Sequence, residues 1–300
     1  MYINSLNDYL KKRFGDKVYK ISLNAGLTCP NRDGKIDTRG CIFCSSGGSG
    51  DFAQSPNISI TEQIALGKAL VANKIKSNKY IAYFQAYTNT YGDINYLRKI
   101  FFEAVNHKDI VAVSIATRPD CIDKNIASLL FELNNIKPVF VELGLQTSNE
   151  STADFIRRGY KNNVFETAVD LLSGLNIVVH IIIGLPFEKE ADILNTIKYI
   201  NHFPINGVKL QLLHILKDTD LYTYYLENPF KILSLEEYGD LLIMCIKHLR
   251  PDIVIHRLTG DGPKKLLAEP MFSANKRMVL NYINNRLQNE NIIQGSLYSC

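Results

Sequence analysis

Six short apolar runs constrain the fold of this chain more than any other feature. They are rich in β-branched residues, and from the second run onward their starts lie roughly 30 residues apart. Continuous apolar runs of this length are typical of parallel strands that are buried on both faces. The runs occupy residues 18–24, 80–86, 110–117, 138–147, 176–185 and 207–216.

Amphipathic segments separate these runs and place apolar residues at helical spacing. One of them begins with Ser234-Leu235-Glu236-Glu237, a pattern typical of a helix capping box. The predicted helices span residues 61–76, 94–105, 122–133, 163–172, 188–200 and 234–249. A β-α repeat of this length predicts an α/β fold, a partial (β/α)6 TIM-like barrel.

The segment 251–300 has a different pattern. It contains a strand-like run at 253–258, a Gly-Asp-Gly-Pro turn and a helix from about 275 to 288. We therefore expect residues 1–250 to form the core barrel and residues 251–300 to form a short C-terminal extension packed on it.

The composition is that of an ordinary globular protein, with 46% hydrophobic and 21% charged residues. No apolar run reaches the roughly 18 residues that span a bilayer. The first 14 residues also lack the apolar segment of a signal peptide. We therefore expect a cytoplasmic protein without a membrane partner, in which free cysteines stay reduced.

The net charge of +4 is distributed unevenly along the chain. Residues 1–50 carry eight Lys and Arg against four Asp and Glu, and residues 251–300 carry six against four, which leaves −2 for the middle. Basic ends are compatible with a polyanionic substrate. Scattered, solvated lysines explain the same charges equally well.

Three cysteines, Cys29, Cys41 and Cys44, follow the first predicted strand with the spacing C-x11-C-x2-C, within a loop at 24–52. In a reducing compartment, clustered cysteines indicate metal binding and not a disulfide. Three thiolates can hold three corners of an iron–sulfur cube and leave the fourth iron without a protein ligand. A metal site with an open position is suited to chemistry, by the logic that separates open from closed zinc sites.

Other interpretations of the cysteines remain open. A structural zinc site needs four ligands, and Cys121, the one further candidate, follows a different predicted strand. A thiol-redox C-x2-C pair usually opens a helix. Cys121, Cys245 and Cys300 have no partner spacing, so we expect buried or incidental thiols.

The residues around the cysteines support an open cluster. Phe43 can cover the edge of a cluster, and the nearby glycines allow the backbone to approach its inorganic core. These glycines are Gly40, Gly47, Gly48 and Gly50. A flexible loop and a core aromatic ring are the alternatives.

Polar residues stand where the predicted strands end. In parallel barrels the reactive groups lie at the C-terminal ends of the strands. The sequence therefore predicts a functional rim. It comprises Gln85, Tyr87, Thr117, Arg118, Glu142, Gln146, Gln211 and His214.

With these motifs the chain resembles the radical S-adenosylmethionine (SAM) superfamily, and within it the YhcC/YtqA-type family. The matching stretches run from residue 23 to about 263, and Asn275-Lys276 fits the C-terminal part of that family. They are LNAGLTCPNRDG, GCIFC, SGGSGDFA, YFQAYTNTYG, ATRPDC, VELGLQT, RRGY, IIGLP and HRLTGDGP. A more distant similarity, through TRPD, VELGLQ and the Arg-Gly pair, is to the radical SAM subunit of Elongator.

The resemblance implies a [4Fe-4S] cluster on Cys29, Cys41 and Cys44, with SAM chelating the fourth iron. It also implies an enzyme in which one electron, from a donor such as flavodoxin or ferredoxin, cleaves SAM. The products are methionine and a 5′-deoxyadenosyl radical, which abstracts a hydrogen atom from the substrate. The protein would bind and orient these groups and exclude water.

The resemblance further implies the SAM contacts, and no catalytic residue is assigned. The end of the second strand, Gln85 to Tyr87, replaces an acidic GGE-like version, which leaves the partner of the SAM amino group open. Glu142 and Gln146 are expected at the ribose. Arg158 is expected at the methionyl carboxylate, or alternatively as a charge at a helix end.

Three further sites complete these expectations. Gly184 is expected to present backbone to adenine. Thr117 and Arg118 are expected to face SAM or substrate, although Arg118 could equally form a structural salt bridge. His256 and Arg257 could touch substrate, and His180 is expected to be a core histidine.

The same resemblance points to tRNA, at the C5 substituent of a wobble uridine. Reworking an existing substituent, such as a carboxymethylaminomethyl group, is one hypothesis. Expected phosphate contacts are Lys11-Lys12-Arg13, Lys264-Lys265 and Lys276-Arg277. A radical SAM enzyme with a small-molecule substrate and a non-enzymatic zinc or iron–sulfur binding module are the alternatives.

Overall fold

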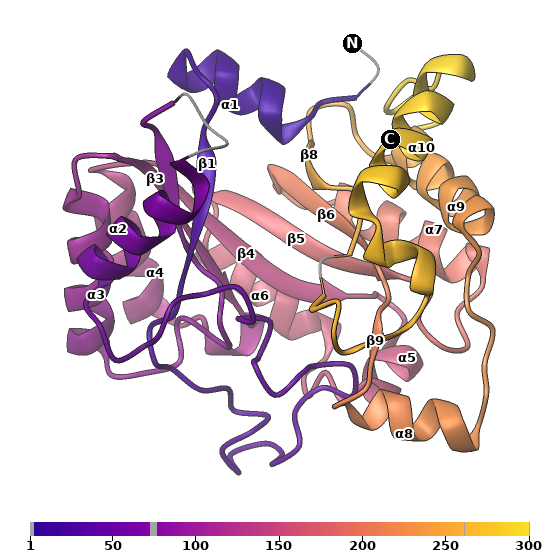
Figure 1. Cartoon of the computed structure of the whole chain (residues 1–300), viewed down its shortest axis with the longest axis horizontal. Coiled ribbons are helices and arrows are strands. Elements are labelled where there is room, and N and C mark those ends of the chain that lie inside the picture. Colours follow the sequence, from indigo (N-terminus) through magenta and orange to yellow (C-terminus); the bar gives the residue numbers. More distant parts are fainter. Residues whose placement is uncertain (1–2, 73–76, 261, 300) are drawn as a thin grey trace.

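A curved parallel sheet organises the computed structural model, which describes residues 3–72, 77–260 and 262–299. Its seven strands follow the order β1-β2-β3-β4-β5-β6-β8, and every neighbouring pair is parallel (Figure 1). The strands are β1 (Tyr19–Leu23), β2 (Tyr80–Phe84), β3 (Ile110–Thr117), β4 (Val139–Gln146), β5 (Asn176–Ile183), β6 (Gly207–Leu212) and β8 (Val254–Arg257). Two further strands, β7 (Ile215–Leu216) and β9 (Leu267–Glu269), form a separate antiparallel pair.

Helices cover the outer face of the sheet between successive strands (Figure 1). They are α2 (Ile60–Val71), α3 (Ile94–Asn106), α4 (Lys124–Asn134), α5 (Glu150–Phe155), α6 (Asn162–Leu171), α7 (Glu190–Asn201) and α9 (Leu235–His248). The remaining helices are α1 (Leu6–Phe14), α8 (Asp220–Glu227), α10 (Lys276–Asn289) and the short 3-10 turns η2 (Pro119–Cys121) and η3 (Met271–Ala274). The predicted α/β class and partial barrel are confirmed.

The barrel contains one strand more than the six expected. The run at 253–258, predicted as part of an extension, supplies β8, which pairs with β6 through Gly207–Val254 and Val208–Ile255. β8 completes the sheet although it has only four residues, because α9 returns the chain to the edge of β6. The domain boundary at residue 250 stays a prediction.

Some expectations fall at the limits of the described residues. The helix expected at 61–76 is observed as α2, and its predicted end at 73–76 lies outside the described residues. Residue 261 of the Gly-Asp-Gly-Pro turn and Cys300 lie outside them as well. Within the part of the chain that is described, no helix is long and apolar enough to cross a bilayer.

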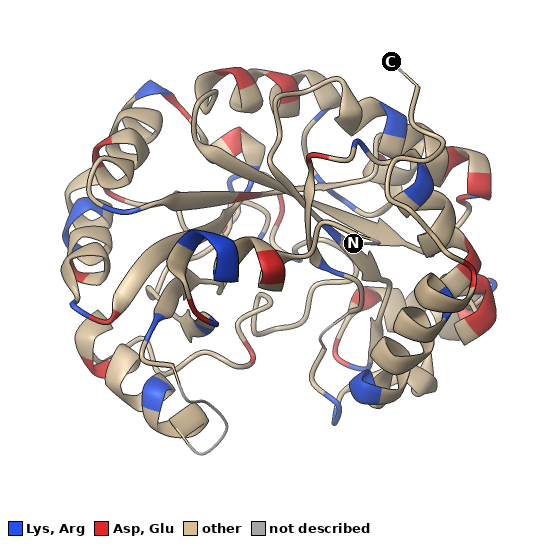
Figure 2. Cartoon of the chain, turned by 90° about the horizontal axis from the view of Figure 1, so that it is seen from above, with Lys and Arg blue, Asp and Glu red and all other residues tan. Residues whose placement is uncertain are grey.

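The interior of the barrel is closed at the end where the strands begin. Helix α1 lies across this base, which is the side seen in Figure 2, and Leu10 is buried there against Ile81, Phe140 and Val178. The Ile255 N–H donates to the Asn4 carbonyl at 2.7 Å, so the segment before α1 is tied to β8. The opposite end, where the strands finish, carries the cysteine loop (Figure 1). The barrel therefore has an apolar base and a mouth lined by loops.

Candidate cluster and cofactor site

The cysteine loop connects β1 to α2 and is fixed to the other side of the mouth. The Ile42 N–H donates to the Ile156 carbonyl at 3.1 Å, and the Leu221 N–H donates to the Ile42 carbonyl at 2.9 Å. Ile42 thus joins the loop to the end of α5 and the start of α8. Phe43, the predicted cover of a cluster edge, packs against the group of apolar side chains that includes Ile42, Ile156 and Leu221.

Two side chains between the first and second cysteines hold the loop from within. Asn31 is fully buried, and its Nδ2 donates to the Arg157 carbonyl at 2.7 Å and reaches Cys41 Sγ at 3.5 Å. The Arg32 Nη2 donates to the Cys44 and Ser45 carbonyls at 2.8 and 2.7 Å. The sequence analysis missed both roles, although both residues lie in the Cys-Pro-Asn-Arg-Asp-Gly motif.

Glycines place the same loop in direct contact with the end of β2. A Cβ on Gly48, whose φ is +58°, would lie 2.3 Å from the Tyr87 ring, and one on Gly50 would lie 2.5 Å from Ala86 Cβ. Their N–H groups donate to Ser45 and Gly47 carbonyls within the loop. These two glycines therefore serve loop packing in the described contacts, and the expected donation to inorganic sulfide stays a prediction.

The three cysteines carry free thiols and line one cavity of about 250 Å³. Burial raises the pKa of Cys41 to about 11 and also raises that of Cys44, and a thiolate at Cys29 would raise both further. Thiols with a raised pKa stay protonated at neutral pH unless a bound metal compensates the thiolate charge. A soft three-thiolate donor set of this kind fits an iron–sulfur cluster.

The zinc interpretation requires ligands that converge on one ion. Among residues 3–72, 77–260 and 262–299, no three His, Cys, Asp or Glu side chains are close enough to share a single ion. A cluster places each thiolate on a different iron, so it does not require this convergence.

The wall of the cavity brings together most of the residues predicted to bind the cofactor. They are Phe43, Gln85, Tyr87, Thr117, Glu142, Gln146 and Arg158, with Arg118 beside them. Gly184 does not belong to this wall. It lines a separate small cavity, and a Cβ there would lie 2.9 Å from Leu233 Cδ1.

The ends of β2 and β3 contribute polar groups that are already engaged. Gln85 Oε1 accepts from the Ser22 hydroxyl at 2.9 Å, and the Tyr87 hydroxyl donates to the Ser46 carbonyl at 2.7 Å. The hydroxyls of Thr117 and Thr90 lie 2.6 Å apart. No carboxylate follows β2 at this point, and the partner of the SAM amino group stays open.

The end of β4 presents the clearest free acceptor. Gln146 has a φ of +69° beside an irregularity in the pairing with β5, and its side chain faces the cavity. Its Oε1 is buried and has no hydrogen-bond partner among the described residues. A buried acceptor without a partner costs free energy, and a ribose hydroxyl would satisfy it.

Glu142, the other residue predicted at the ribose, lies deeper in the barrel. Its side chain is fully buried, and Lys20, Ser114, His180 and Lys209 donate to its two oxygens. A ribose hydroxyl would have to compete with four donors, so the proposed ribose contact has less support at Glu142 than at Gln146.

Arg158 is a buried clamp between β4 and the next helices. Its Nη1 donates to the carbonyls of Leu145 and Thr147 at 3.1 and 2.8 Å. Its Nε donates to the Tyr160 carbonyl at 3.0 Å, and its Nη2 donates to Asn162 Oδ1 at 2.9 Å. Arg158 is 1% exposed, so a SAM carboxylate would compete with these acceptors.

Arg118 has a different arrangement on the same wall. It forms a two-pronged ion pair with Asp120 at 2.9 and 2.8 Å, and its guanidinium lies 5.1 Å from the centre of the Tyr160 ring. Burial alone would lower the pKa of Arg118, but the Asp120 carboxylate outweighs burial and raises it. Arg118 therefore forms the salt bridge that was one alternative for it, and it also lines the cavity.

The histidines and Arg257 separate in the structure. His180 faces the cavity, and Arg257 lines it together with Gly260, Gly262 and Pro263. His256 lies outside the wall and packs edge-to-face on Phe140, with ring centres 5.7 Å apart. The expectation that His256 and Arg257 act together at the substrate is therefore not supported for His256.

Lys209 is one of the wall residues that the sequence analysis missed. It lies in β6 within the apolar run Val208-Lys209-Leu210, where a charged residue facing inward is the one available signal. Its side chain is 3% exposed.

Comparison with known proteins identifies the family. A model of the Radical SAM superfamily matches residues 36–200, and a model of the Radical_SAM C-terminal domain matches residues 205–289. YtqA of Bacillus subtilis (strain 168) is 40% identical over 98% of this chain and 92% of its own length. YhcC of Escherichia coli (strain K12) is 34% identical over 98% of this chain and 94% of its own length.

Solved structures agree in fold. Elp3 of the archaeon Methanocaldococcus infernus, lacking its N-terminus, matches with a TM-score of 0.67 at 17% identity over 92% of this chain, which spans 64% of that Elp3 chain. Methylornithine synthase (PylB) matches with a TM-score of 0.54 at 11% identity over 92% of this chain and 83% of its own. A [4Fe-4S] cluster and SAM are the cofactors of the matched family. The chain therefore belongs to the radical SAM superfamily.

Proposed function

We propose that this protein modifies the C5 substituent of a wobble uridine in tRNA, with its cluster on Cys29, Cys41 and Cys44. One observation carries the radical chemistry. The three thiols open onto the mouth of a barrel whose other end is sealed by α1. A substrate can then meet the cofactor from one side, while the sealed base limits access of water.

The bound cofactors would supply reductive cleavage of SAM to a 5′-deoxyadenosyl radical and hydrogen abstraction from the substrate. The chain's own part is to bind and orient. Asn31 and Arg32 hold the cysteine loop, and Gln146 offers an acceptor to the ribose. Phe43 excludes water on the side of α5 and α8.

The charges near the mouth support an RNA partner. Lys264 and Lys265 are exposed next to Pro263, which lines the cavity, and Lys35 and Arg39 are exposed on the cysteine loop. Phosphate contacts of this kind supply affinity without sequence preference. Lys11-Lys12-Arg13 lies on α1 at the sealed base, so an RNA bound at the mouth would not meet these cations (Figures 1 and 2).

The test is anaerobic cluster reconstitution followed by reduction in the presence of SAM, with 5′-deoxyadenosine measured by mass spectrometry. We expect product with the native chain and none with Cys44→Ala. Cys121→Ala is the matched control, because it removes a thiol that is outside the cavity wall.

The substrate is tested separately with tRNA from cells that lack this protein. A changed wobble uridine after incubation supports the proposal. SAM cleavage without any change in tRNA, and without tRNA binding at low salt, would favour a small-molecule substrate. A chain that holds zinc and leaves SAM intact would contradict the enzymatic role altogether. The cytoplasmic location and the flavodoxin or ferredoxin donor remain predictions.

A further inference from the structure

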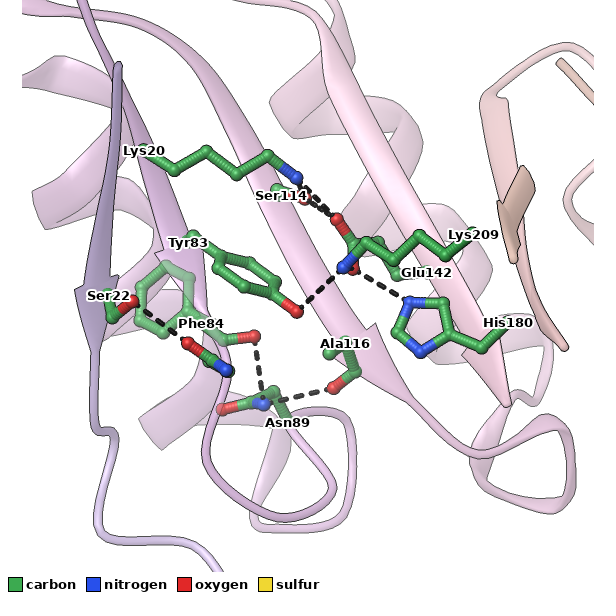
Figure 3. Close-up of polar contacts among 11 residues, drawn as sticks. Lys20, Ser22, Tyr83, Phe84, Asn89, Ser114, Ala116, Glu142, His180 and Lys209 are labelled. Atoms are coloured by element: carbon green, nitrogen blue, oxygen red, sulfur yellow. Dashed lines mark hydrogen bonds and ion pairs between the residues drawn. The ribbon is translucent and has the colours of Figure 1, made fainter. Parts of the chain in front are cut away.

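A layer of buried and half-buried polar side chains crosses the barrel between the apolar base and the cysteine loop. We call it the polar floor, and it consists of Lys20, Tyr83, Ser114, Glu142, His180 and Lys209 (Figure 3). The residues come from six different strands, β1 to β6, and their interactions converge on one carboxylate. Nothing in the cluster chemistry requires this layer.

Two ammonium groups share that carboxylate. Lys20 Nζ and the Ser114 hydroxyl donate to Glu142 Oε1 at 2.7 and 2.6 Å, while His180 Nε2 and Lys209 Nζ donate to Oε2. Burial and the charge of Lys209 lower the pKa of His180 to about 4, so His180 is neutral at physiological pH. Two lysines against one glutamate leave the polar floor with an excess positive charge.

This excess is costly where it lies. The Lys209 side chain is 3% exposed, and an unbalanced buried charge is strongly disfavoured. Burial lowers the pKa of Lys209 well below its ordinary value even though Glu142 is in contact, and the charges of Lys20 and Arg257 lower it further. An anion close to Lys209 would relieve this repulsion.

A purely structural role explains only part of the arrangement. One lysine and one glutamate would be enough to pin two strands, and the second lysine adds charge without a second carboxylate. The polar floor is also open toward the mouth, because Tyr83, Glu142, His180 and Lys209 line the same cavity as the cysteines. The apolar base closes it from below.

Lys209 retains a donor for a ligand. An ammonium group has three N–H donors, and the described residues supply two acceptors, Glu142 and the Tyr83 hydroxyl at 3.0 Å. The third donor belongs to a side chain that lines the cavity. An oxyanion that enters from the mouth can accept it.

We propose that the polar floor is an anion subsite, in which Lys209 binds a compact terminal oxyanion of the substrate, a carboxylate or a phosphomonoester. The subsite would set how far the substrate reaches below the cofactor, and so which atom meets the radical. The polar floor lies at the deep end of the cavity, next to the apolar base, so on a tRNA the bound group would be a terminal one. The anion subsite adds a recognition element to the proposed function and rests on that function for the identity of the substrate.

The test uses the full chain, without SAM, reductant or RNA. Thermal unfolding is followed in acetate, in inorganic phosphate and in chloride at equal ionic strength. We expect acetate or phosphate to protect the native chain beyond chloride. Protection by acetate alone assigns a carboxylate, and protection by phosphate alone assigns a phosphomonoester.

Two variants give effects of opposite sign, which a merely structural residue would not. Lys209→Met should weaken anion binding at least tenfold, and Glu142→Gln should strengthen it, because it removes the competing carboxylate. Lys217→Met, at an exposed lysine outside the cavity, is the control and should bind as the native chain does.

Either of two results would overturn the anion subsite. One is a native chain that neither anion protects, a result that does not depend on any variant folding. The other is native-like anion binding by a folded Lys209→Met. The proposed function fails independently, through the absence of 5′-deoxyadenosine, so the two failures are distinguishable.

Discussion

Glu188 shows how a single buried group can make stability depend on pH. It follows the turn after β5, one of its oxygens accepts from Thr147, and the other is buried without a partner among the described residues. Burial raises the pKa of Glu188 from its ordinary 4.5 to about 7. The folded chain therefore binds this proton more tightly than the unfolded chain, and stability falls as the pH rises from about 4.5 through about 7.

Glu188→Gln should remove this loss, because the amide cannot ionise and its oxygen can still accept from Thr147. We expect the variant to be more stable than the native chain by about 3 kcal/mol at pH 8, and equally stable below pH 4.5. Urea unfolding across this pH range is the measurement. Glu227→Gln, at an exposed position on α8, is the control, and a pH profile that Glu188→Gln leaves unchanged would contradict the prediction.

At the same scale, the sequence predicted residue types better than residue partners. That Cys29, Cys41 and Cys44 would lie together was predictable because they are close in sequence, and the structure places all three at one cavity. Arg158 was predicted as a ligand for a carboxylate, yet its donors go to carbonyls and to Asn162. The acceptors of a buried guanidinium come from turns whose position depends on the tertiary fold, so local sequence does not reveal them.

Among the elements, the cysteine loop depends most on close packing. Gly48→Ala would introduce a Cβ 2.3 Å from the Tyr87 ring at a positive φ. We expect the loop to separate from the end of β2 and the iron content after reconstitution to fall severalfold. Gly34→Ala is a matched control in the same loop, because its φ is +92° but nothing lies within 4 Å of the added Cβ. Equal iron loss in both variants would attribute the effect to backbone strain alone.

Helix α1 should stabilise the barrel through its buried face. Leu10→Ala removes an apolar side chain packed on Ile81, Phe140 and Val178, and we expect a loss of about 2–4 kcal/mol in the free energy of unfolding. Lys12→Ala, at an exposed position of the same helix, should change it by less than about 0.5 kcal/mol. Urea denaturation distinguishes the two, and equal effects would mean that α1 does not seal the base.

The strands of the sheet could be predicted from sequence as apolar runs, whereas helix α1 and the place of β8 in the sheet could not. Strands β3, β4 and β5 are eight-residue apolar runs, and their pattern alone identifies them. Helix α1 was missed because Lys11-Lys12-Arg13 dominates its composition, although Leu6, Tyr9 and Leu10 lie on one face. Strand β8 is four residues long, and its place in the sheet is decided by its neighbour β6 and not by its own pattern.

At the scale of the whole molecule, two of the three basic clusters expected to bind phosphate lie at opposite ends of the barrel. Lys264 and Lys265 lie beside the mouth, whereas Lys11 and Lys12 lie at the base. We expect Lys264→Ala with Lys265→Ala to weaken tRNA binding and to lower its salt dependence by about one unit of slope per lost phosphate contact. Lys11→Ala with Lys12→Ala should leave both unchanged. Filter binding over a range of salt concentrations measures this. If only the Lys11 and Lys12 substitutions weakened binding, the RNA would lie elsewhere on the protein.

The net charges of the sequence segments could not distinguish the mouth of the barrel from its base. They treated the basic N-terminal and C-terminal segments as one group, because net charge carries no direction. The polar floor was invisible for the same reason, since Lys20, Glu142 and Lys209 lie far apart along the chain and meet only when the sheet curls. The rim of strand ends was predictable, because parallel strands bring their C-terminal ends together wherever they lie in the sequence.

The tie between Asn4 and Ile255 has a consequence for how the protein is made. The ribosome delivers the segment before α1 earlier than any strand of the sheet, and it delivers β8 after all the other strands of that sheet. The hydrogen bond between Asn4 and Ile255 cannot form until β8 has emerged. The nascent sheet is therefore closed onto a segment made before it, and no stalled fragment that ends before β8 can carry this closure.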